Sequence, residues 1–367
     1  MPSNRDTPRV FVAATRMNDG KTTTSLGLLS ALQQHHPRIG YIKPVGQRFV
    51  AVEEQKIDED SVLMQQVYQI RAPLVDMSPI AVEPDFTRRY LECANSDALV
   101  RRIEKAFDRV AWEKDFVLCE GTGHAGVGSV FDLSNATVAR ILGAKVVVVT
   151  QGGIGRPIDE LALNQALFER EGVQIIGVIL NKVLPQKIEQ ITDFVRRGLK
   201  RRGLRLLGVI PHLPLLSSPT LAAIREDLDA DVLNSHAHID NIVERVVVGA
   251  MSVHHAMHHL TPGALVITPG DREDILLAAG ASLNRSNGAG NLSGIILTDN
   301  IRPSAAVTRI VREMPFPVLL AEGDSYQVAS RVHDLTVKTR PADTRKIQMI
   351  RDLVCQHVEV AAILDSL

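Results

Sequence analysis

The stretch ATRMNDGKTTTSLGLL, residues 14–29, follows the short apolar run RVFVA at residues 9–13. A chain that leaves a buried strand and opens a helix presents unpaired backbone N–H groups and the positive end of the helix dipole at the turn. Gly20 has no Cβ, so the backbone there can approach an anion closely. The sequence Gly20-Lys21-Thr22 therefore predicts the end of a phosphate-binding loop.

The residues at the end of this loop have distinct expected roles. Lys21 can reach the β- and γ-phosphate oxygens of a nucleotide, the Thr22 hydroxyl can hold Mg²⁺, and Thr23 can meet the α-phosphate. An incidental helix start with the same three letters is the alternative interpretation. The preceding strand, the helix and the motif agree with one another, which favours nucleotide binding.

A magnesium ion needs further oxygen ligands, which carboxylates usually supply. Glu120 ends a second apolar run at residues 116–121, and ligands in open α/β sheets collect beyond the carboxyl ends of strands. Asp60 follows another run at an expected helix start, where an acidic residue is also common for helix stability alone. Asp58 and Glu59 are nearby alternatives, and we prefer Asp60.

The first 220 residues alternate short β-branched runs with amphipathic helical patterns. Nearly continuous apolar strands separated by helices predict a parallel sheet covered on both faces, an α/β, P-loop NTPase-like, doubly wound fold. The expected strands are residues 9–13, 38–44, 116–121, 144–151, 173–181 and 204–211, with helices at 22–35, 97–110 and 157–170.

A second strand–helix series predicts a smaller α/β domain, with a boundary near residue 235. We assign residues 8–222 to the nucleotide-binding domain, 236–345 to the smaller domain and 346–367 to a C-terminal helix that belongs to a helical pattern at 343–365. The strands expected in the smaller domain are 264–269, 292–299, 316–322 and 335–340, with helices at 250–260, 272–284, 303–313 and 324–333.

The overall composition predicts a soluble cytoplasmic protein. Lys plus Arg number 41 against 42 Asp plus Glu, so no general attraction to nucleic acid or to a membrane is expected. No apolar run approaches the length of a bilayer crossing, and the polar start is unlike a signal peptide. Cys93, Cys119 and Cys355 show neither a disulfide nor a zinc spacing, which suits a reducing compartment.

Five motifs in order resemble the dethiobiotin synthetase group of P-loop proteins, shared in part with cobyrinic acid a,c-diamide synthases: AT-x4-GKTT, YIKPV, DEDSVLM, CEGTGH and ILNKV. That group begins its loop with Gly-Thr, so Ala14-Thr15 in place of the Walker glycine is a variant of the family pattern. The resemblance implies that Lys43 points to the γ-phosphate and the acceptor.

The same resemblance implies the rest of the site. Thr22, Asp60 and Glu120 match its magnesium ligands, and Asn181 matches the residue that reads the adenine ring. The residues expected to bind the nucleotide are Thr15, Asp19, Gly20, Lys21, Thr22, Thr23 and Asn181, with Lys21 and Lys43 as the catalytic pair.

The resemblance extends into the second half of the chain. The stretch LLGVIPHLPLLSSPTL and the later VGAMSVHHAMHHLTPGALVITPGDREDILLAA and SGIILTDNIRPSAAV are similar to the DRTGG domain. The combination resembles the N-terminal region of long phosphate acetyltransferases. The chain ends at Leu367 without room for their catalytic domain, so acetyl transfer to phosphate is not expected. Met17 and Gly46-Gln47-Arg48 depart from the acceptor-binding loops of dethiobiotin synthetases.

Two functions follow from these observations. The first is a Mg²⁺-dependent ATP-binding protein with slow ATPase or ATP-dependent ligase-type activity and a regulatory DRTGG domain. The alternative is a non-catalytic nucleotide-sensing or scaffold subunit, with a phosphate acetyltransferase as a partner. By resemblance the chain is expected to form a homo-oligomer.

Three further features have less specific interpretations. Arg156, after a glycine-rich turn, can contact phosphate or a second substrate, or belong to a turn and a dimer contact. His254 and His258 are spaced by one helical turn and could bind a metal, but no carboxylate or Cys is adjacent, which favours a solvated or interface face. Asp271 and Arg272 lie at a helix start where a small anion could bind.

Overall fold

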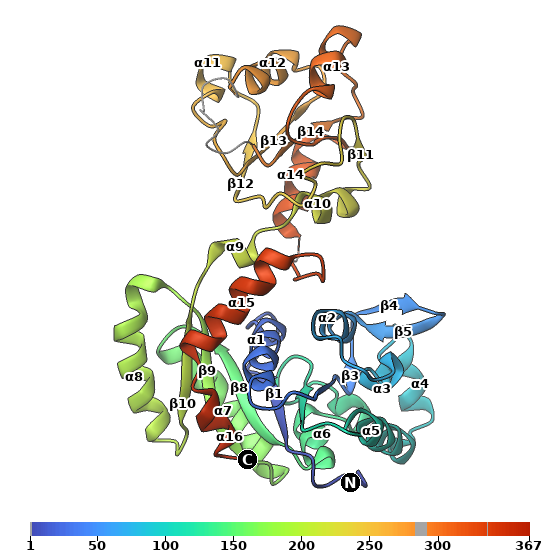
Figure 1. The fold of residues 1–367 in the computed structure, drawn as a ribbon, viewed down its shortest axis with the longest axis vertical. Helices are drawn as coiled ribbons and strands as arrows, with labels where there is room; N and C mark the ends of the chain where they lie inside the picture. Colours follow the sequence, from blue (N-terminus) through green and yellow to red (C-terminus); the bar gives the residue numbers. More distant parts are fainter. Residues whose placement is uncertain (1, 283–291, 336) are drawn as a thin grey trace. The chain divides into compact units, whose positions relative to one another are not determined.

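A computed structural model describes residues 2–282, 292–335 and 337–367 (Figure 1). The chain forms two compact units. The first comprises Met1–His212 together with Thr339–Leu367, and the second comprises Leu213–Lys338. The second unit begins earlier than the boundary near residue 235 that the sequence pattern predicts, because Leu221, Ile224 and Leu228 pack in its core.

The first unit is built on a six-stranded sheet in which every strand is parallel to its neighbours. Its strand order is β10-β9-β8-β1-β7-β2, and the three strands β1, β7 and β2 are buried along their whole length. The strands are β1 (Arg9–Ala14), β2 (Ile39–Ile42), β7 (Phe116–Glu120), β8 (Lys145–Gln151), β9 (Ile175–Val183) and β10 (Leu206–Pro211).

The strand order explains why helices cover both faces of this sheet. The connection after β1 runs past β7 to β2, whereas the connection after β8 runs in the opposite direction to β9. Right-handed crossovers in opposite directions place their helices on opposite faces, which confirms the predicted doubly wound fold. The main helices are α1 (Lys21–Gln33), α2 (Glu59–Tyr68), α5 (Ser96–Val110), α6 (Asn135–Leu142), α7 (Gly155–Arg170) and α8 (Ile188–Lys200).

Residues 45–92 form small elements that the sequence pattern did not predict. Two strand pairs lie here, one parallel and one an antiparallel hairpin, beside two short helices. The elements are β3 (Val45–Gly46), β4 (Phe49–Val52), β5 (Gln55–Asp58), α3 (Leu74–Met77), β6 (Ile80–Ala81) and α4 (Phe86–Glu92).

The C-terminal segment returns to the first unit and packs on α1 (Figure 1). The single helix predicted at 343–365 is two helices, α15 (Thr344–His357) and α16 (Val360–Leu364). They are separated because Val358 pairs with Gly208 of β10 and the Glu359 N–H donates to the Leu207 carbonyl of the same strand. Gly27 of α1 lies against Val354 of α15, and a Cβ at position 27 would lie 2.5 Å from the Val354 Cβ.

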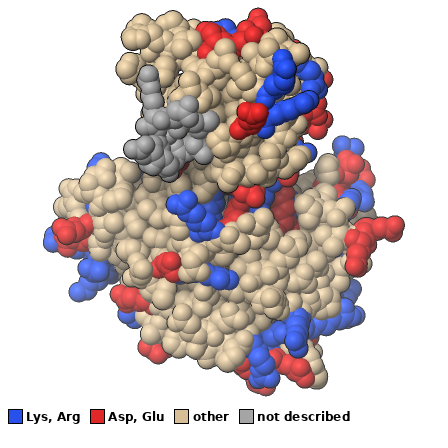
Figure 2. Space-filling view, turned by 45° about the horizontal axis from the view of Figure 1, so that its top comes forward, with Lys and Arg blue, Asp and Glu red and all other residues tan. Residues whose placement is uncertain are grey.

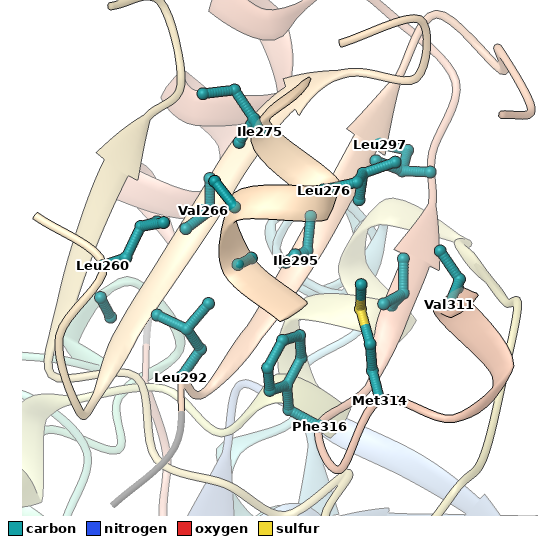
Figure 3. Close-up of a cluster of buried hydrophobic side chains, with 14 of the residues drawn as sticks. Leu260, Val266, Ile275, Leu276, Leu292, Ile295, Leu297, Val311, Met314 and Phe316 are labelled. Atoms are coloured by element: carbon teal, nitrogen blue, oxygen red, sulfur yellow. The ribbon is translucent and has the colours of Figure 1, made fainter. Parts of the chain in front are cut away.

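The second unit contains a five-stranded sheet of order β11-β15-β14-β13-β12, parallel except for β11. The strands are β11 (Asp231–Val232), β12 (Arg245–Val248), β13 (Ala264–Pro269), β14 (Gly294–Thr298) and β15 (Val318–Leu320). Figure 3 shows apolar side chains from β13 and β14 packing with Leu276, Met314 and Phe316 in one buried cluster.

Several predictions for the second unit are wrong in detail. The strand expected at 335–340 does not form at 335 or 337–340, and residue 336 lies outside the described residues. The strand that pairs with β13 at the edge of the sheet is β12, whose sequence RVVV lies in a stretch where no strand was expected. The helix expected at 250–260 is reduced to one turn, because backbone bonds near residue 257 form successive turns.

The helices at residues 273–282, 305–312 and 325–334 agree in position with the predicted ones. Residues 283–284 of the helix expected at 272–284 lie outside the described residues. The helices are α9 (Pro214–Ser217), α10 (Leu221–Leu228), α11 (Val253–Ala256), α12 (Glu273–Ser282), α13 (Ala305–Arg312) and α14 (Ser325–Asp334).

The surface carries both signs of charge. On the face drawn in Figure 2, basic and acidic side chains are interspersed among uncharged ones. This agrees with the near-balance of charged residues in the sequence. Across the described residues, every helix is too short or too polar to cross a membrane.

Candidate functional site

The loop between β1 and α1 lies at the carboxyl end of the central strand, with β8 on one side and β7 on the other. Gly20 is the N-cap of α1 and has a φ of 90°, which a residue with a side chain rarely adopts. A Cβ at this position would also overlap the Asn181 side-chain amide. Glycine is therefore required here both for the backbone angle and for the close approach of β9.

Asn181 holds the backbone of the loop in place. Its Nδ2 donates to the Asp19 carbonyl at 2.8 Å, and its Oδ1 accepts from the Lys182 N–H at 2.9 Å. Lys182 Nζ donates to the Asn18 carbonyl at 2.8 Å. The structure thus places Asn181 beside the loop, whereas a contact with an adenine ring stays a prediction.

Thr22, Asp60 and Glu120 come together from three different elements. Glu120 ends β7, Asp60 lies in the first turn of α2, and Thr22 lies in the first turn of α1. The Thr22 Oγ1 lies 2.9 Å from Glu120 Oε1 and 3.2 Å from Asp60 Oδ2. A hydroxyl has one hydrogen and can donate to only one of these oxygens. Three oxygen atoms that converge in this way are a suitable donor set for a divalent cation.

Lys43 pairs with two aspartates at this edge of the sheet. Its Nζ lies 2.9 Å from Asp58 Oδ1 and also contacts Asp60 Oδ2. Burial alone would lower the pKa of Lys43, but the carboxylates of Asp60 and Asp58 raise it above its ordinary value. The ammonium is therefore held in its charged form by its partners.

Asp58 is a site residue that the sequence left as an alternative to Asp60. It caps α2 by accepting from the Asp60 N–H at 3.0 Å, and its own N–H donates to Ser78 Oγ at 2.9 Å. Burial raises the pKa of Asp58, and Lys43 opposes that shift. The spacing of two residues between Asp58 and Asp60 is the sequence signal that puts both carboxylates beside Lys43.

Burial also shifts the pKa values of the ionisable groups nearest the phosphate loop. Burial lowers the pKa of Lys21, while the Glu120 carboxylate acts in the opposite direction. Burial and the negative charge of Asp60 raise the pKa of Glu120. Tyr41, which is fully buried, donates to Glu120 Oε2 at 3.1 Å. Such perturbed groups gathered at one point are typical of functional sites.

Thr15 and Asp19 form a polar network behind the loop. The Thr15 hydroxyl lies 2.7 Å from Asp19 Oδ2 and 2.9 Å from Thr150 Oγ1. Asp19 Oδ2 also accepts from the Arg16 N–H at 3.0 Å, and the Arg16 side chain pairs with Glu160 of α7 at 3.3 Å. These contacts give Thr15 and Asp19 a role in shaping the loop, and their contact with a nucleotide stays a prediction.

The Asp19→Asn variant should remove a pH-dependent contribution to stability. Burial raises the pKa of Asp19 to about 6 from its ordinary 3.8, so the folded state binds more protons between these values. Wild-type stability therefore falls as the pH rises through this window. The free energy of unfolding of the variant minus that of wild type should therefore increase by about 2 kcal/mol as the pH rises through this window. Chemical denaturation in EDTA over this pH range measures the difference, and a pH-independent value would contradict the assignment.

Two buried asparagines that the sequence analysis missed fix the loop after β7. Asn135 of α6 accepts from the Thr122 N–H at 2.9 Å and donates to the His124 carbonyl at 2.6 Å. Asn164 of α7 accepts from the Ala125 N–H at 2.7 Å and donates to the Thr15 carbonyl at 3.2 Å. Asn164 therefore joins the loop after Glu120 to the start of the phosphate loop. No local motif marks either residue.

Two other candidates have side-chain partners of their own. Arg156 pairs with Glu160 on the same helix at 2.8 Å. Arg272 pairs with Asp274 at 2.8 Å and donates to the carbonyls of Gly249 and Met251 at 3.0 and 2.9 Å, which closes the turn after β12. Within the described residues, no group of three or more His, Cys, Asp or Glu side chains is arranged to hold a metal ion.

Comparisons with known proteins match most of the chain. Residues 8–220 match the AAA domain family, and residues 223–335 match the DRTGG domain. A phosphate acetyltransferase of Synechocystis is 28% identical over 98% of this chain and 52% of its own length. That of Pseudomonas putida is 30% identical over 96% of this chain and 50% of its own length. The chain thus spans about half the length of these relatives.

Two solved structures show more distant similarity. The MinC:MinD cell division protein complex of Aquifex aeolicus is 14% identical, with a TM-score of 0.37, over 57% of this chain and 83% of that one. The CBS and DRTGG domains of Clostridium perfringens pyrophosphatase are 17% identical, with a TM-score of 0.26, over 43% of this chain and 72% of that one.

The family matches agree with the geometry of the first unit. A P-loop domain of this family supports nucleotide binding, and the DRTGG domain predicted from the sequence is confirmed. The chain belongs to the AAA domain family through its P-loop domain at residues 8–220, and it carries a DRTGG domain. It is homologous to the N-terminal region of phosphate acetyltransferases.

Proposed function

We propose that the first unit binds ATP with Mg²⁺ and turns it over slowly, as an ATPase or as the activating half of a ligase-type reaction. The observation that carries this proposal is the convergence of the Thr22 hydroxyl with Asp60 and Glu120 beside the phosphate loop. The Thr22 hydroxyl has one hydrogen, so it can donate to only one of the two carboxylates. When both carboxylates are charged, its contact with the other one has no hydrogen between the two oxygens. A divalent cation held by these three residues would compensate both carboxylates.

The donor set fits Mg²⁺ better than a metal that needs a complete protein cage. Mg²⁺ is commonly bound through one or two carboxylates and substrate phosphates, with water completing its coordination. Thr22, Asp60 and Glu120 would hold it here, where it would supply neutralisation of the phosphate charge.

The protein's own groups account for the remaining tasks. The backbone N–H groups at the start of α1 and the Lys21 ammonium bind the phosphates. Lys43, which contacts Asp60, would stabilise charge on the terminal phosphoryl group. Asn135 and Asn164 keep the loop after Glu120 in one conformation, so the donors need little reorganisation during reaction.

Calorimetric titration of the whole protein with ATP, with Mg²⁺ and with EDTA, tests the proposal together with an assay of phosphate release. We expect micromolar or tighter binding with Mg²⁺, weaker binding in EDTA, and slow Mg²⁺-dependent release. Absence of ATP binding would overturn the proposal. Tight binding without phosphate release over hours would leave the nucleotide-sensing subunit as the function.

The DRTGG unit is proposed to regulate the first unit, and the protein is proposed to be a cytoplasmic homo-oligomer. Homology to phosphate acetyltransferases makes such an enzyme the first partner to test. A pull-down of the tagged chain against a purified phosphate acetyltransferase, with and without ATP, measures the association. Sedimentation of the chain alone measures its oligomeric state.

A further inference from the structure

Lys43 and the proposed divalent cation share one ligand atom. The Lys43 ammonium contacts Asp60 Oδ2, and the same oxygen lies 3.2 Å from the Thr22 hydroxyl. Lys43 therefore already occupies one side of the cluster in which Thr22, Asp60 and Glu120 converge.

Two cations cannot both be held closely at this oxygen without strong repulsion. A Mg²⁺ ion binds a carboxylate oxygen at about 2.1 Å. Lys43 is 6% exposed and Asp60 is also 6% exposed, so little water screens charges there. Lys21 brings a second ammonium to the same region, and its positive charge acts against that of Lys43. Retaining Lys43 on Asp60 while a divalent cation binds would place three cationic centres around one carboxylate.

Asp58 provides an alternative anchor for the lysine. Its Oδ1 already lies 2.9 Å from Lys43 Nζ, and its Oδ2 has no hydrogen-bond partner although the residue is only 1% exposed. The cap on α2 and the bond to Ser78 fix Asp58 independently of Lys43. A small rotation of the lysine would keep the contact with Asp58 and leave Asp60 Oδ2 to another cation.

We propose that Lys43 is a resident counter-ion that neutralises Asp60 in the empty site and moves toward Asp58 when a divalent cation binds. The ammonium then directs its remaining N–H groups to the terminal phosphate of the nucleotide. This inference rests on the proposed function and adds one consequence to it: recognition of the metal and of the terminal phosphate are coupled through one side chain.

Titration with Mn²⁺ in the absence of nucleotide tests the first half of this coupling. Lys43→Met keeps the length of the side chain and removes its charge, so Mn²⁺ affinity should rise about tenfold or more. Lys182→Met is the matched control, because it removes an exposed ammonium beside the phosphate loop that donates to the Asn18 carbonyl, and it should change the affinity less than about threefold. Equal affinities in Lys43→Met and Lys182→Met would overturn the proposal.

The Lys43→Met change leaves three buried carboxylates with less compensation, so the variant can fail to fold without metal. The double variant Lys43→Met/Asp58→Asn removes one of those charges and retains all three proposed metal ligands. It should also bind Mn²⁺ about tenfold more tightly than Asp58→Asn alone. Unchanged affinity in this pair would overturn the proposal even if the single variant is unstable.

Comparison of ATP with ADP tests the second half. Wild type should prefer ATP over ADP by about tenfold with Mg²⁺ and show little preference in EDTA, whereas the Lys43 variant should show little preference in either buffer. The Mn²⁺ titrations need no nucleotide, so they distinguish failure of the proposed ATP binding from failure of the proposed Lys43 coupling. Lack of ATP binding in wild type defeats the proposed function, and a Lys43→Met variant that keeps the metal-dependent preference defeats the coupling.

Discussion

Replacement of Lys21 by alanine is expected to weaken ATP binding by about a hundredfold or more. Lys21 follows the N-cap glycine of α1, and its ammonium lies in the field of Glu120, Asp60 and Asp58. A charge-assisted contact to phosphate is strong because little water competes with it in a partly buried site. Removal of the ammonium leaves that acidic group to repel the nucleotide. Calorimetric titration with ATP in Mg²⁺ buffer measures the loss.

The matched control for this variant is Lys182→Ala. Lys182 also lies beside the phosphate loop, but its exposed ammonium donates to the Asn18 carbonyl. We expect its loss to change ATP affinity by about threefold or less. If the two variants lose affinity equally, general positive charge near the loop binds the nucleotide, and the specific role assigned to Lys21 is wrong.

Replacement of Gly27 by alanine is expected to destabilise the first unit by about 2 kcal/mol, although alanine is ordinarily the better helix former. Gly27 lies inside α1, and a Cβ there would lie 2.5 Å from the Val354 Cβ and 3.0 Å from the Ile350 carbonyl oxygen of α15. Both atoms belong to or adjoin the backbone of α15, so the whole helix must move. Thermal and chemical unfolding of the full chain measure the change.

Gly198→Ala is the control for the Gly27 variant. Gly198 lies inside α8, and a Cβ there would meet the terminal Cδ1 of Ile158 at 2.5 Å. The tip of an isoleucine side chain can rotate away, so the gain in helix propensity should make this variant neutral or slightly more stable. Equal destabilisation by both changes would show that close packing of α1 against α15 is not the cause.

The nucleotide-binding half of the fold could be predicted because its signals are local. Buried strands such as β1 and β7 are short runs of apolar residues, and the phosphate loop is a contiguous motif. Glu120 ends β7, so the rule that ligands gather at the carboxyl edge of a parallel sheet brings it to the loop. Asp60 instead follows the hairpin strand β5 and lies in the first turn of α2. The distance of 2.9 Å from the Thr22 hydroxyl to Glu120 agrees with that rule.

Other parts of the site have no local signal. Asn164 acts on Thr15 and Ala125, which are far from it in sequence, and nothing in its own helix marks that contact. The strand β12 was missed because its exposed edge residues, among them Val246, do not show the continuous apolar run of a central strand. The break at Val358 depends on pairing with Gly208, which the helical pattern of residues 343–365 does not contain.

The return of α15 to the first unit has a consequence for the order in which the protein is made. The phosphate loop and α1 leave the ribosome early, whereas residues 344–357, which cover α1, are translated only after the complete second unit. A fragment that stops at His212 would carry an uncovered apolar surface on α1. The nucleotide-binding unit should be expressed with residues 213–338 excised and a flexible linker joining the two remaining segments.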